Sequence, residues 1–176
     1  DFLAWNPEND GRFSVRTAYH IAVNQIQNHG GVSTSSRPDG DRPVWRMFWK
    51  IQVPQKVKIC AWKMLKKGLP TRQVKKSKHL DVVVECPRCG RGTEDSFHAV
   101  VACPTSSAVW DAMGEVWTVP AKETIRNTGD EWLFDLLVTI QEEERAKVLM
   151  IVWRNWQLRN DSMHDKTVPP VKVSRD

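Results

Sequence analysis

Residues 86–103 read CPRCGRGTEDSFHAVVAC and hold three of the four cysteines in the 176-residue chain. Two cysteines separated by two residues can bind one tetrahedral ion from a single tight turn. A histidine and a further cysteine follow at distances that can close the coordination shell. We therefore predict one structural Zn²⁺ ion, held by Cys86, Cys89, His98 and Cys103. Four protein ligands leave no open position for water, so hydrolytic zinc chemistry is not expected.

A disulfide, or reduced thiols beside an ordinary histidine, are the alternatives to zinc. An odd number of local cysteines argues against a disulfide framework, as does the lack of a secretion signal. His79 is a second candidate for the histidine ligand, but it lies outside the motif, and a solvated histidine beside lysines fits it better. Thr93, followed by Glu94-Asp95, predicts the start of a short helix that directs His98 toward the metal.

The helix expected before the cysteines begins at Pro54 and ends at the break Gly68-Leu69-Pro70. Its apolar residues fill one broad face of a helical wheel, and these are Val57, Cys60, Ala61, Met64 and Leu65, extended by Ile59 and Trp62. A narrow basic stripe lies opposite and consists of Lys56, Lys63 and Lys67. We expect a mostly buried helix with one exposed basic ridge, in which Cys60 is a small core residue rather than a ligand.

Most of the remaining chain is also predicted to be helical. Helices are expected at residues 15–28 (capped by Ser14), 44–51, 129–140 and 141–162, in a short basic segment capped by Thr71, and after a cap at Thr105 or Ser106. Residues 2–15 predict a small β-hairpin, and residues 30–43 a flexible loop. The expected fold class is mainly α: a helical domain with a short N-terminal β-hairpin and an embedded CCHC zinc module.

Positive charge is concentrated immediately before the zinc segment. The formal net charge of the chain is +5. Residues 42–80 contain twelve Lys and Arg and no acid, so the remaining residues together carry a net charge of −7. A polyanion would relieve the repulsion among these cations. The alternative is a solvated face that is balanced in space by the acids at 81–95 and 111–144. The candidates for nucleic-acid contact are Lys56, Lys63, Lys67, Arg72, Lys75, Lys76 and Lys78.

Four tryptophans offer a second means of contacting nucleic acid. Trp45, Trp49, Trp62 and Trp110 could stack on bases. Tryptophans at helical spacing are more often part of the core, and we favour that interpretation here.

Several classes of protein lack support in the sequence. No paired carboxylates, Ser/His/Asp set or Gly-rich phosphate loop stands out, so no enzymatic activity is predicted. The chain has no run of about 18 apolar residues, and its N-terminus lacks the features of a signal peptide. We expect an intracellular protein, nuclear or cytoplasmic, that is not secreted. Because the chain does not begin with Met, we also expect it to be a piece of a longer protein.

Several short motifs follow one another in a specific order over residues 1–160. They are Trp5 and Gly11-Arg12-Phe13-Ser14-Val15-Arg16-Thr17-Ala18-Tyr19; Trp45, Trp49, Val53-Pro54-Gln55-Lys56-Val57-Lys58 and Trp62; Leu69-Pro70-Thr71; the 86–103 segment with Glu94; Trp110; and Trp153, Trp156 and Arg159-Asn160. This order resembles the zinc-binding domain of plant LINE-type (non-LTR) retrotransposon reverse transcriptases. In that family the domain lies between a reverse transcriptase and, often, an RNase H-like domain.

The resemblance implies a zinc-stabilised module that binds nucleic acid, with Cys86, Cys89, His98 and Cys103 as its ligands. It also suggests a division into a zinc-binding domain at residues 1–128, a C-terminal helical extension at 129–162 and a linker-like tail at 163–176.

Two functions fit these observations. The first is a non-catalytic module of a retroelement polyprotein that holds RNA or DNA through the basic residues 42–80. The second is a retroelement-derived domain carried into another plant protein, for example an immune receptor, where it serves as a protein-interaction or decoy surface. Both functions keep the zinc site and the core.

Overall fold

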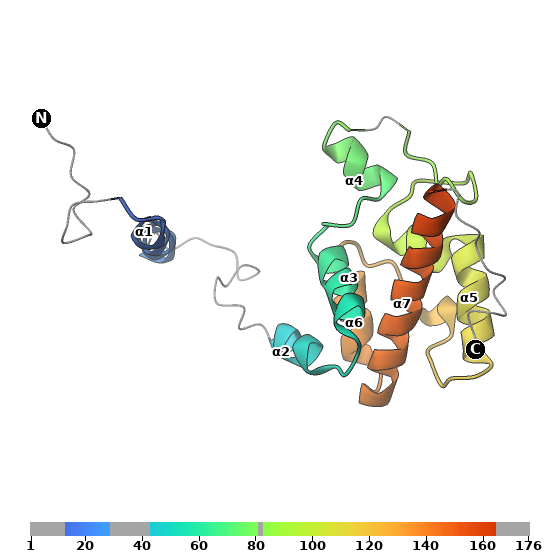
Figure 1. Cartoon of the computed structure of the whole chain (residues 1–176). Helices are drawn as coiled ribbons and strands as arrows, with labels where there is room; N and C mark the ends of the chain where they lie inside the picture. Colours follow the sequence, from blue (N-terminus) through green and yellow to red (C-terminus); the bar gives the residue numbers. More distant parts are fainter. Residues whose placement is uncertain (1–12, 29–42, 81–82, 165–176) are drawn as a thin grey trace, which may run out of the picture. The chain divides into compact units, whose positions relative to one another are not determined.

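The computed structural model describes residues 13–28, 43–80 and 83–164 (Figure 1). The chain divides into two compact units, residues 1–46 and 47–176. The helical elements are α1 (Val15–Asn28), α2 (Pro43–Lys50), α3 (Gln55–Leu65), α4 (Arg72–Ser77), η1 (His98–Ala102), α5 (Pro104–Gly114), η2 (Lys122–Thr124), α6 (Trp132–Thr139) and α7 (Glu142–Met163). Among the described residues, β pairing is limited to one isolated bridge between Glu85 and Thr93. The predicted mainly α fold is therefore confirmed.

Several predictions concern residues outside the described ranges. Most of the expected β-hairpin at 2–15, of the loop at 30–43 and of the linker-like tail at 163–176 falls there. The division of the chain after residues 128 and 162 also stays a prediction.

Helix α7 is the central element of the second unit. It packs against α3, α5 and η1, and Figure 1 shows α3 to its left and α5 to its right. A capping box between Gln141 and Glu144 holds its first turn, where acidic side chains also complement the helix dipole. Its inward stripe is at most 2% exposed at Val148, Leu149, Ile151, Val152 and Leu158. Burial of each such side chain contributes about 1.5–3 kcal/mol, so this stripe is a main source of stability.

Helix α3 buries the central part of its predicted apolar face. Its buried residues are Val57, Cys60, Ala61 and Met64. The expected extension of this face is wrong, because Ile59 is 41% exposed and Trp62 is 38% exposed. Since α3 packs on α7 from one side, residues at the edges of the apolar face stay in solvent. Lys67 lies beyond the end of α3, with a φ of 53°, and does not continue the basic stripe of the helix.

The other predicted helices are present, with small changes at their ends. The hydroxyl of Ser14 accepts a hydrogen bond from the Thr17 N–H at 3.4 Å, and the hydroxyl of Thr71 accepts one from the Val74 N–H at 3.2 Å. Both predicted caps are therefore confirmed. Helix α5 begins at Pro104 rather than after Thr105 or Ser106, because proline is well suited to the first helical turn. Within the described ranges, every helix is too short or too polar to cross a membrane.

Candidate metal centre

The four predicted zinc ligands lie together in one cluster. Their ligand atoms are all within 4.8 Å of one another. The Sγ atoms of Cys86 and Cys103 are 3.9 Å apart, and Cys89 Sγ is 3.4 Å from Nε2 of His98. A tetrahedral Zn²⁺ ion with Zn–S of about 2.3 Å and Zn–N of about 2.0 Å needs S–S and S–N separations of roughly 3.8 and 3.5 Å. The cluster therefore has the donors of a Cys₃His zinc site, and the Cys86–Cys103 and Cys89–His98 separations match those of such a site.

The first two cysteines are held by a tight turn within residues 86–103, which we call the zinc loop. The Gly90 N–H donates to the Cys86 carbonyl at 2.8 Å, and the Cys86 N–H donates to the Gly92 carbonyl at 3.0 Å. Gly90 and Gly92 both have a φ of +64°, which glycine adopts at little energetic cost. These contacts place the Cys86 and Cys89 side chains on the same side of the turn.

The second pair of ligands is positioned by a π-helical turn. The carboxylate of Asp95 accepts a hydrogen bond from the His98 N–H at 2.6 Å and so caps this turn, in place of the predicted start at Thr93. The Cys103 N–H donates to the carbonyl of His98, five residues earlier, at 2.8 Å. Such wide turns are rare and occur often at functional sites. The turn places both ligand side chains beside the cysteine turn.

The thiols of the cluster have different environments. Burial raises the pKa of Cys86 to about 12, against partial opposition from hydrogen bonds of the Cys89 and Arg88 backbone. Burial acts the same way on Cys103, but hydrogen bonds with Thr105 and the nearby charge of Arg88 outweigh it and hold the pKa of Cys103 below its usual range. Metal binding requires thiolates, so a bound cation would take the place of the thiol protons.

A buried ion pair behind the zinc loop was not predicted from the sequence. Glu94 is 0% exposed and Arg159 of α7 is 3% exposed. Two hydrogen bonds of 2.8 Å join the guanidinium to both carboxylate oxygens. One signal was available, because Arg159 lies seven residues after Val152 and three after Trp156, on the apolar stripe of α7. A charged residue on such a stripe indicates a buried partner.

The same glutamate attaches helix α4 to the zinc loop. Its carboxylate accepts a hydrogen bond from the Arg72 N–H at 2.9 Å, and its carbonyl accepts one from the Gln73 N–H at 3.2 Å. The guanidinium of Arg159 also donates to the Pro70 carbonyl at 3.4 Å. The start of α4 is therefore fixed by a residue that lies between the second and third zinc ligands.

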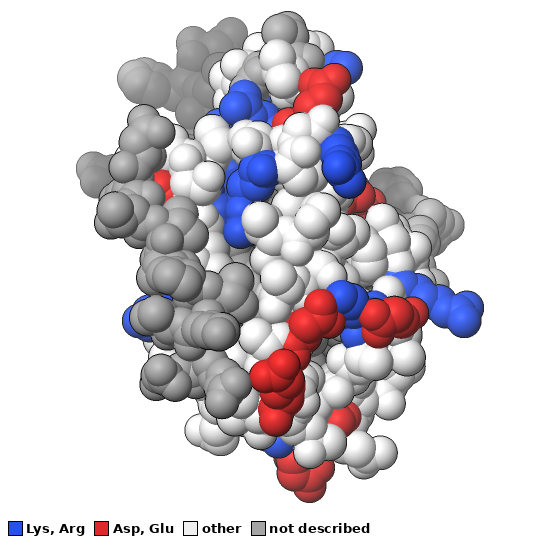
Figure 2. Space-filling model, turned by 90° about the vertical axis from the view of Figure 1, so that its right-hand side faces the viewer, with Lys and Arg blue, Asp and Glu red and all other residues white. Residues whose placement is uncertain are grey.

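The predicted basic residues differ in how they are held. The ammonium of Lys56 lies 4.6 Å from the centre of the Trp153 ring, and Lys67 pairs with Asp130 at 2.5 Å. Lys63, Lys76 and Lys78 are exposed, whereas Arg72 and Lys75 are half-buried. Figure 2 shows that the face on the α5 side carries Lys and Arg together with Asp and Glu. This face of the molecule is therefore of mixed charge and not uniformly positive.

The tryptophans divide into core and surface residues. Trp110 is 3% exposed, and its indole N–H donates to the Val100 carbonyl at 2.8 Å. Trp45 is half-buried. The core interpretation is wrong for Trp49 and Trp62, which are 45% and 38% exposed.

Two residues weighed as alternatives lie outside the cluster. His79 is exposed and is not among the four clustered ligands. Cys60 is 7% exposed on the inner face of α3, where burial raises the pKa of its thiol to about 12. Cys60 therefore occupies the core position that the sequence predicts.

The sequence is similar to those of known proteins. Residues 13–110 match the model of a family described as zinc-binding in reverse transcriptase. A protein of Arabidopsis thaliana that is named for ribonuclease H is 26% identical over 167 residues, which cover 90% of this chain and 24% of that protein. An uncharacterized 149 kDa protein of the transposon TX1 from Xenopus laevis is 37% identical over 65 residues, or 37% of this chain and 5% of that protein. The chain thus spans about a quarter or less of these curated relatives. No solved structure matches it.

Proposed function

Since the chain belongs to the family of zinc-binding domains of reverse transcriptases, we propose that it is a zinc-stabilised, non-catalytic module that contacts RNA or DNA phosphates. The observation that supports this most is the attachment of the basic helix α4 to the zinc loop through Glu94. A folded zinc loop would hold the start of α4 in one place. The chain would serve a longer retroelement protein as a binding module.

The proposed ligands of one Zn²⁺ ion are Cys86, Cys89, His98 and Cys103. A bound zinc ion would supply a cross-link between the cysteine turn and the π-helical turn, with its coordination shell filled by protein. The residues of this site would thereby order the zinc loop rather than activate a substrate.

The proposed nucleic-acid surface comprises the exposed cations of α3, α4 and their ends. Lys63, Lys76 and Lys78 are exposed, and no acid lies within residues 42–80 to neutralise them locally. Trp62 is exposed on α3 one residue before Lys63. Lysines that neutralise phosphates next to an exposed aromatic ring are the usual components of single-strand binding surfaces.

Fluorescence anisotropy with labelled single-stranded RNA and DNA tests this function. The zinc-loaded chain should bind, and the K76E/K78E variant should bind at least about tenfold more weakly, with a salt dependence shallower by about 0.7 per lost single-strand phosphate contact. The matched control is R126E/K147E, which changes the net charge equally outside the basic segment. Equal losses in both variants, or no binding by the wild type at low salt, would overturn the proposal.

The second candidate function is a protein-interaction surface in another host protein. It is favoured by the exposure of Trp49, Ile59 and Trp62, since aromatic and aliphatic side chains at the surface are typical of protein contacts. If single- and double-stranded RNA and DNA all fail to bind at low salt, this candidate replaces the first.

A further inference from the structure

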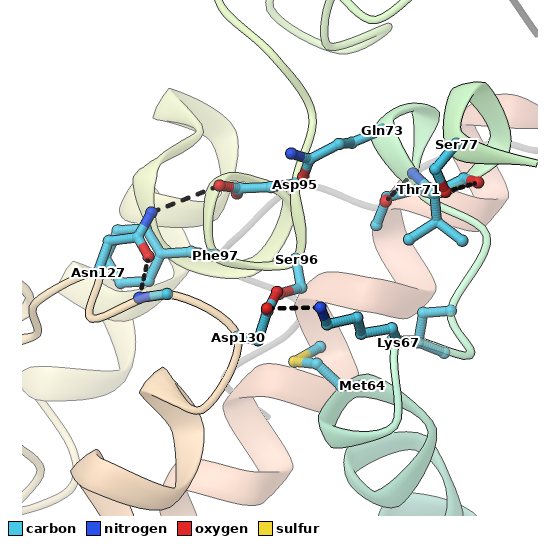
Figure 3. A pocket seen from close by; sticks show the side chains of 13 residues that line it. Met64, Lys67, Thr71, Gln73, Ser77, Asp95, Ser96, Phe97, Asn127 and Asp130 are labelled. Carbon is cyan, nitrogen blue, oxygen red and sulfur yellow. Dashed lines mark hydrogen bonds and ion pairs between the residues drawn. The ribbon is translucent and has the colours of Figure 1, made fainter.

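A cavity of about 330 Å³ lies beside the proposed phosphate-binding helix. It is enclosed by the end of α3, by α4, by the zinc loop and by residues 127–130 before α6 (Figure 3). Its volume falls within the range of small-molecule sites in proteins. The cavity is therefore large enough to receive one nucleobase.

Both apolar and polar side chains line this cavity. Met64 and Leu69 are 3% and 5% exposed, and Phe97 also lines the cavity, with its ring in edge-to-face contact with Trp132 at 5.2 Å. Figure 3 shows the Gln73 amide reaching in from α4 and Asn127 on the opposite side. The Gln73 amide has no hydrogen-bond partner among the described residues, so its donors and acceptor are available. Such a combination suits a flat, apolar ring with a polar edge.

The charges around the rim favour a base over a phosphate. Two carboxylates, Asp95 and Asp130, face one cation, Lys67, which already pairs with Asp130. One oxygen of Asp95 accepts the His98 N–H, and the other has only a long 3.4 Å contact with the Asn127 amide. Carboxylates accept hydrogen bonds from exocyclic amino groups of bases, whereas they repel phosphates. The exposed Lys76 of α4 and Lys78 just after the helix do not line the cavity and can hold the phosphates outside it.

We propose that this cavity binds one unpaired nucleobase with an exocyclic amino group, from a single strand whose phosphates lie on Lys76 and Lys78. Gln73 and Asn127 contact the polar edge of the base, and Asp95 accepts from its amino group. This inference rests on the proposed function and adds a preference for single strands and for bases with an exocyclic amino group (cytosine, adenine or guanine) over uracil.

The test uses the zinc-loaded chain and uridine dodecamers in which one central base is uracil, cytosine or absent. Cytosine differs from uracil at the edge that Asp95 and Gln73 would contact. One cytosine should tighten binding at least about fivefold, as expected for one good base contact, and an abasic site should not. Q73A and N127A should abolish this difference between the cytosine and uracil strands. K76E/K78E should instead weaken all strands equally.

The outcomes separate this inference from the proposed function. If all the strands bind equally and Q73A and N127A behave as wild type, the base pocket is overturned while phosphate binding stands. If duplexes bind as tightly as single strands, the pocket is overturned as well. If no strand binds at low salt, both proposals fail.

Discussion

The zinc loop and the basic segment before it are built on different principles. In the zinc loop four side chains converge on one point, supported by its glycines and by Asp95, while Glu94 joins the loop to α4 and α7. In the basic segment the side chains do not converge: Lys56, Lys58 and Lys67 contact separate partners within the fold. The zinc loop can therefore hold neighbouring elements in place, whereas the basic helix α4 relies on the zinc loop to hold it in place. Substitutions in the two regions should differ accordingly.

The largest effect is expected from loss of the metal. C86S removes a ligand that is 1% exposed, so it should abolish one-equivalent zinc binding and unfold the zinc loop together with α4. Hydrogen exchange of residues 71–103 and thermal unfolding measure this. The control is C60A, which alters a buried cysteine outside the cluster and should keep one equivalent of zinc. Unchanged exchange in C86S would show that the loop folds without its ligands.

The next largest effect should come from the buried ion pair. R159L leaves the Glu94 carboxylate buried without its guanidinium, which should lower the free energy of unfolding by about 3–5 kcal/mol. The double variant E94L/R159L removes both charges and should be less destabilised than R159L. Urea unfolding of the zinc-loaded proteins measures both. Additive losses would indicate that the two residues act independently.

A smaller effect should distinguish the glycines of the zinc loop from a helical glycine. G92A places a Cβ at a φ of +64° and should cost about 1–2 kcal/mol, although no neighbouring atom blocks it. G114A, at the end of α5, also has open space and should stabilise by about 0.5–1 kcal/mol. Thermal unfolding measures the stability of both variants. If both were stabilised or both destabilised, the positive φ of Gly92 would not be what decides the effect of the substitution.

The smallest effect is expected in the basic segment. K56A removes the ammonium from the face of Trp153 and should cost about 0.5–1 kcal/mol, whereas K63A on the same helix should change stability by less than about 0.5 kcal/mol. Urea unfolding resolves this difference if both variants are measured together. Equal stability of K56A and K63A would show that the Trp153 contact contributes nothing.

The clustering of Cys86, Cys89, His98 and Cys103 could be predicted because metal coordination depends on residue type and short spacing. The two cysteines of the turn, the histidine and the final cysteine all lie within 18 residues. Helix positions and two caps were also predictable, since they depend on local apolar spacing and on hydroxyls before a helix.

The features that sequence reasoning missed depend on distant residues or on unusual backbone. Glu94 and Arg159 are 65 positions apart, so no local pattern reports their pairing. A helical wheel showed that Ile59 and Trp62 are on the edge of an apolar face, but not how much of that face α7 would cover. The π-helical turn has no distinctive composition, because His98 and Cys103 would suit an ordinary helix as well.

X-ray absorption spectroscopy at the zinc edge of the folded, metal-loaded chain tests the central assignment most directly. One zinc per chain should show three sulfur ligands at about 2.3 Å and one nitrogen ligand at about 2.0–2.1 Å, with no oxygen ligand. C86S should lose this signature, and C60A should retain it. A folded chain that binds no zinc, or a shell that contains water oxygen or lacks nitrogen, would contradict the assignment of Cys86, Cys89, His98 and Cys103.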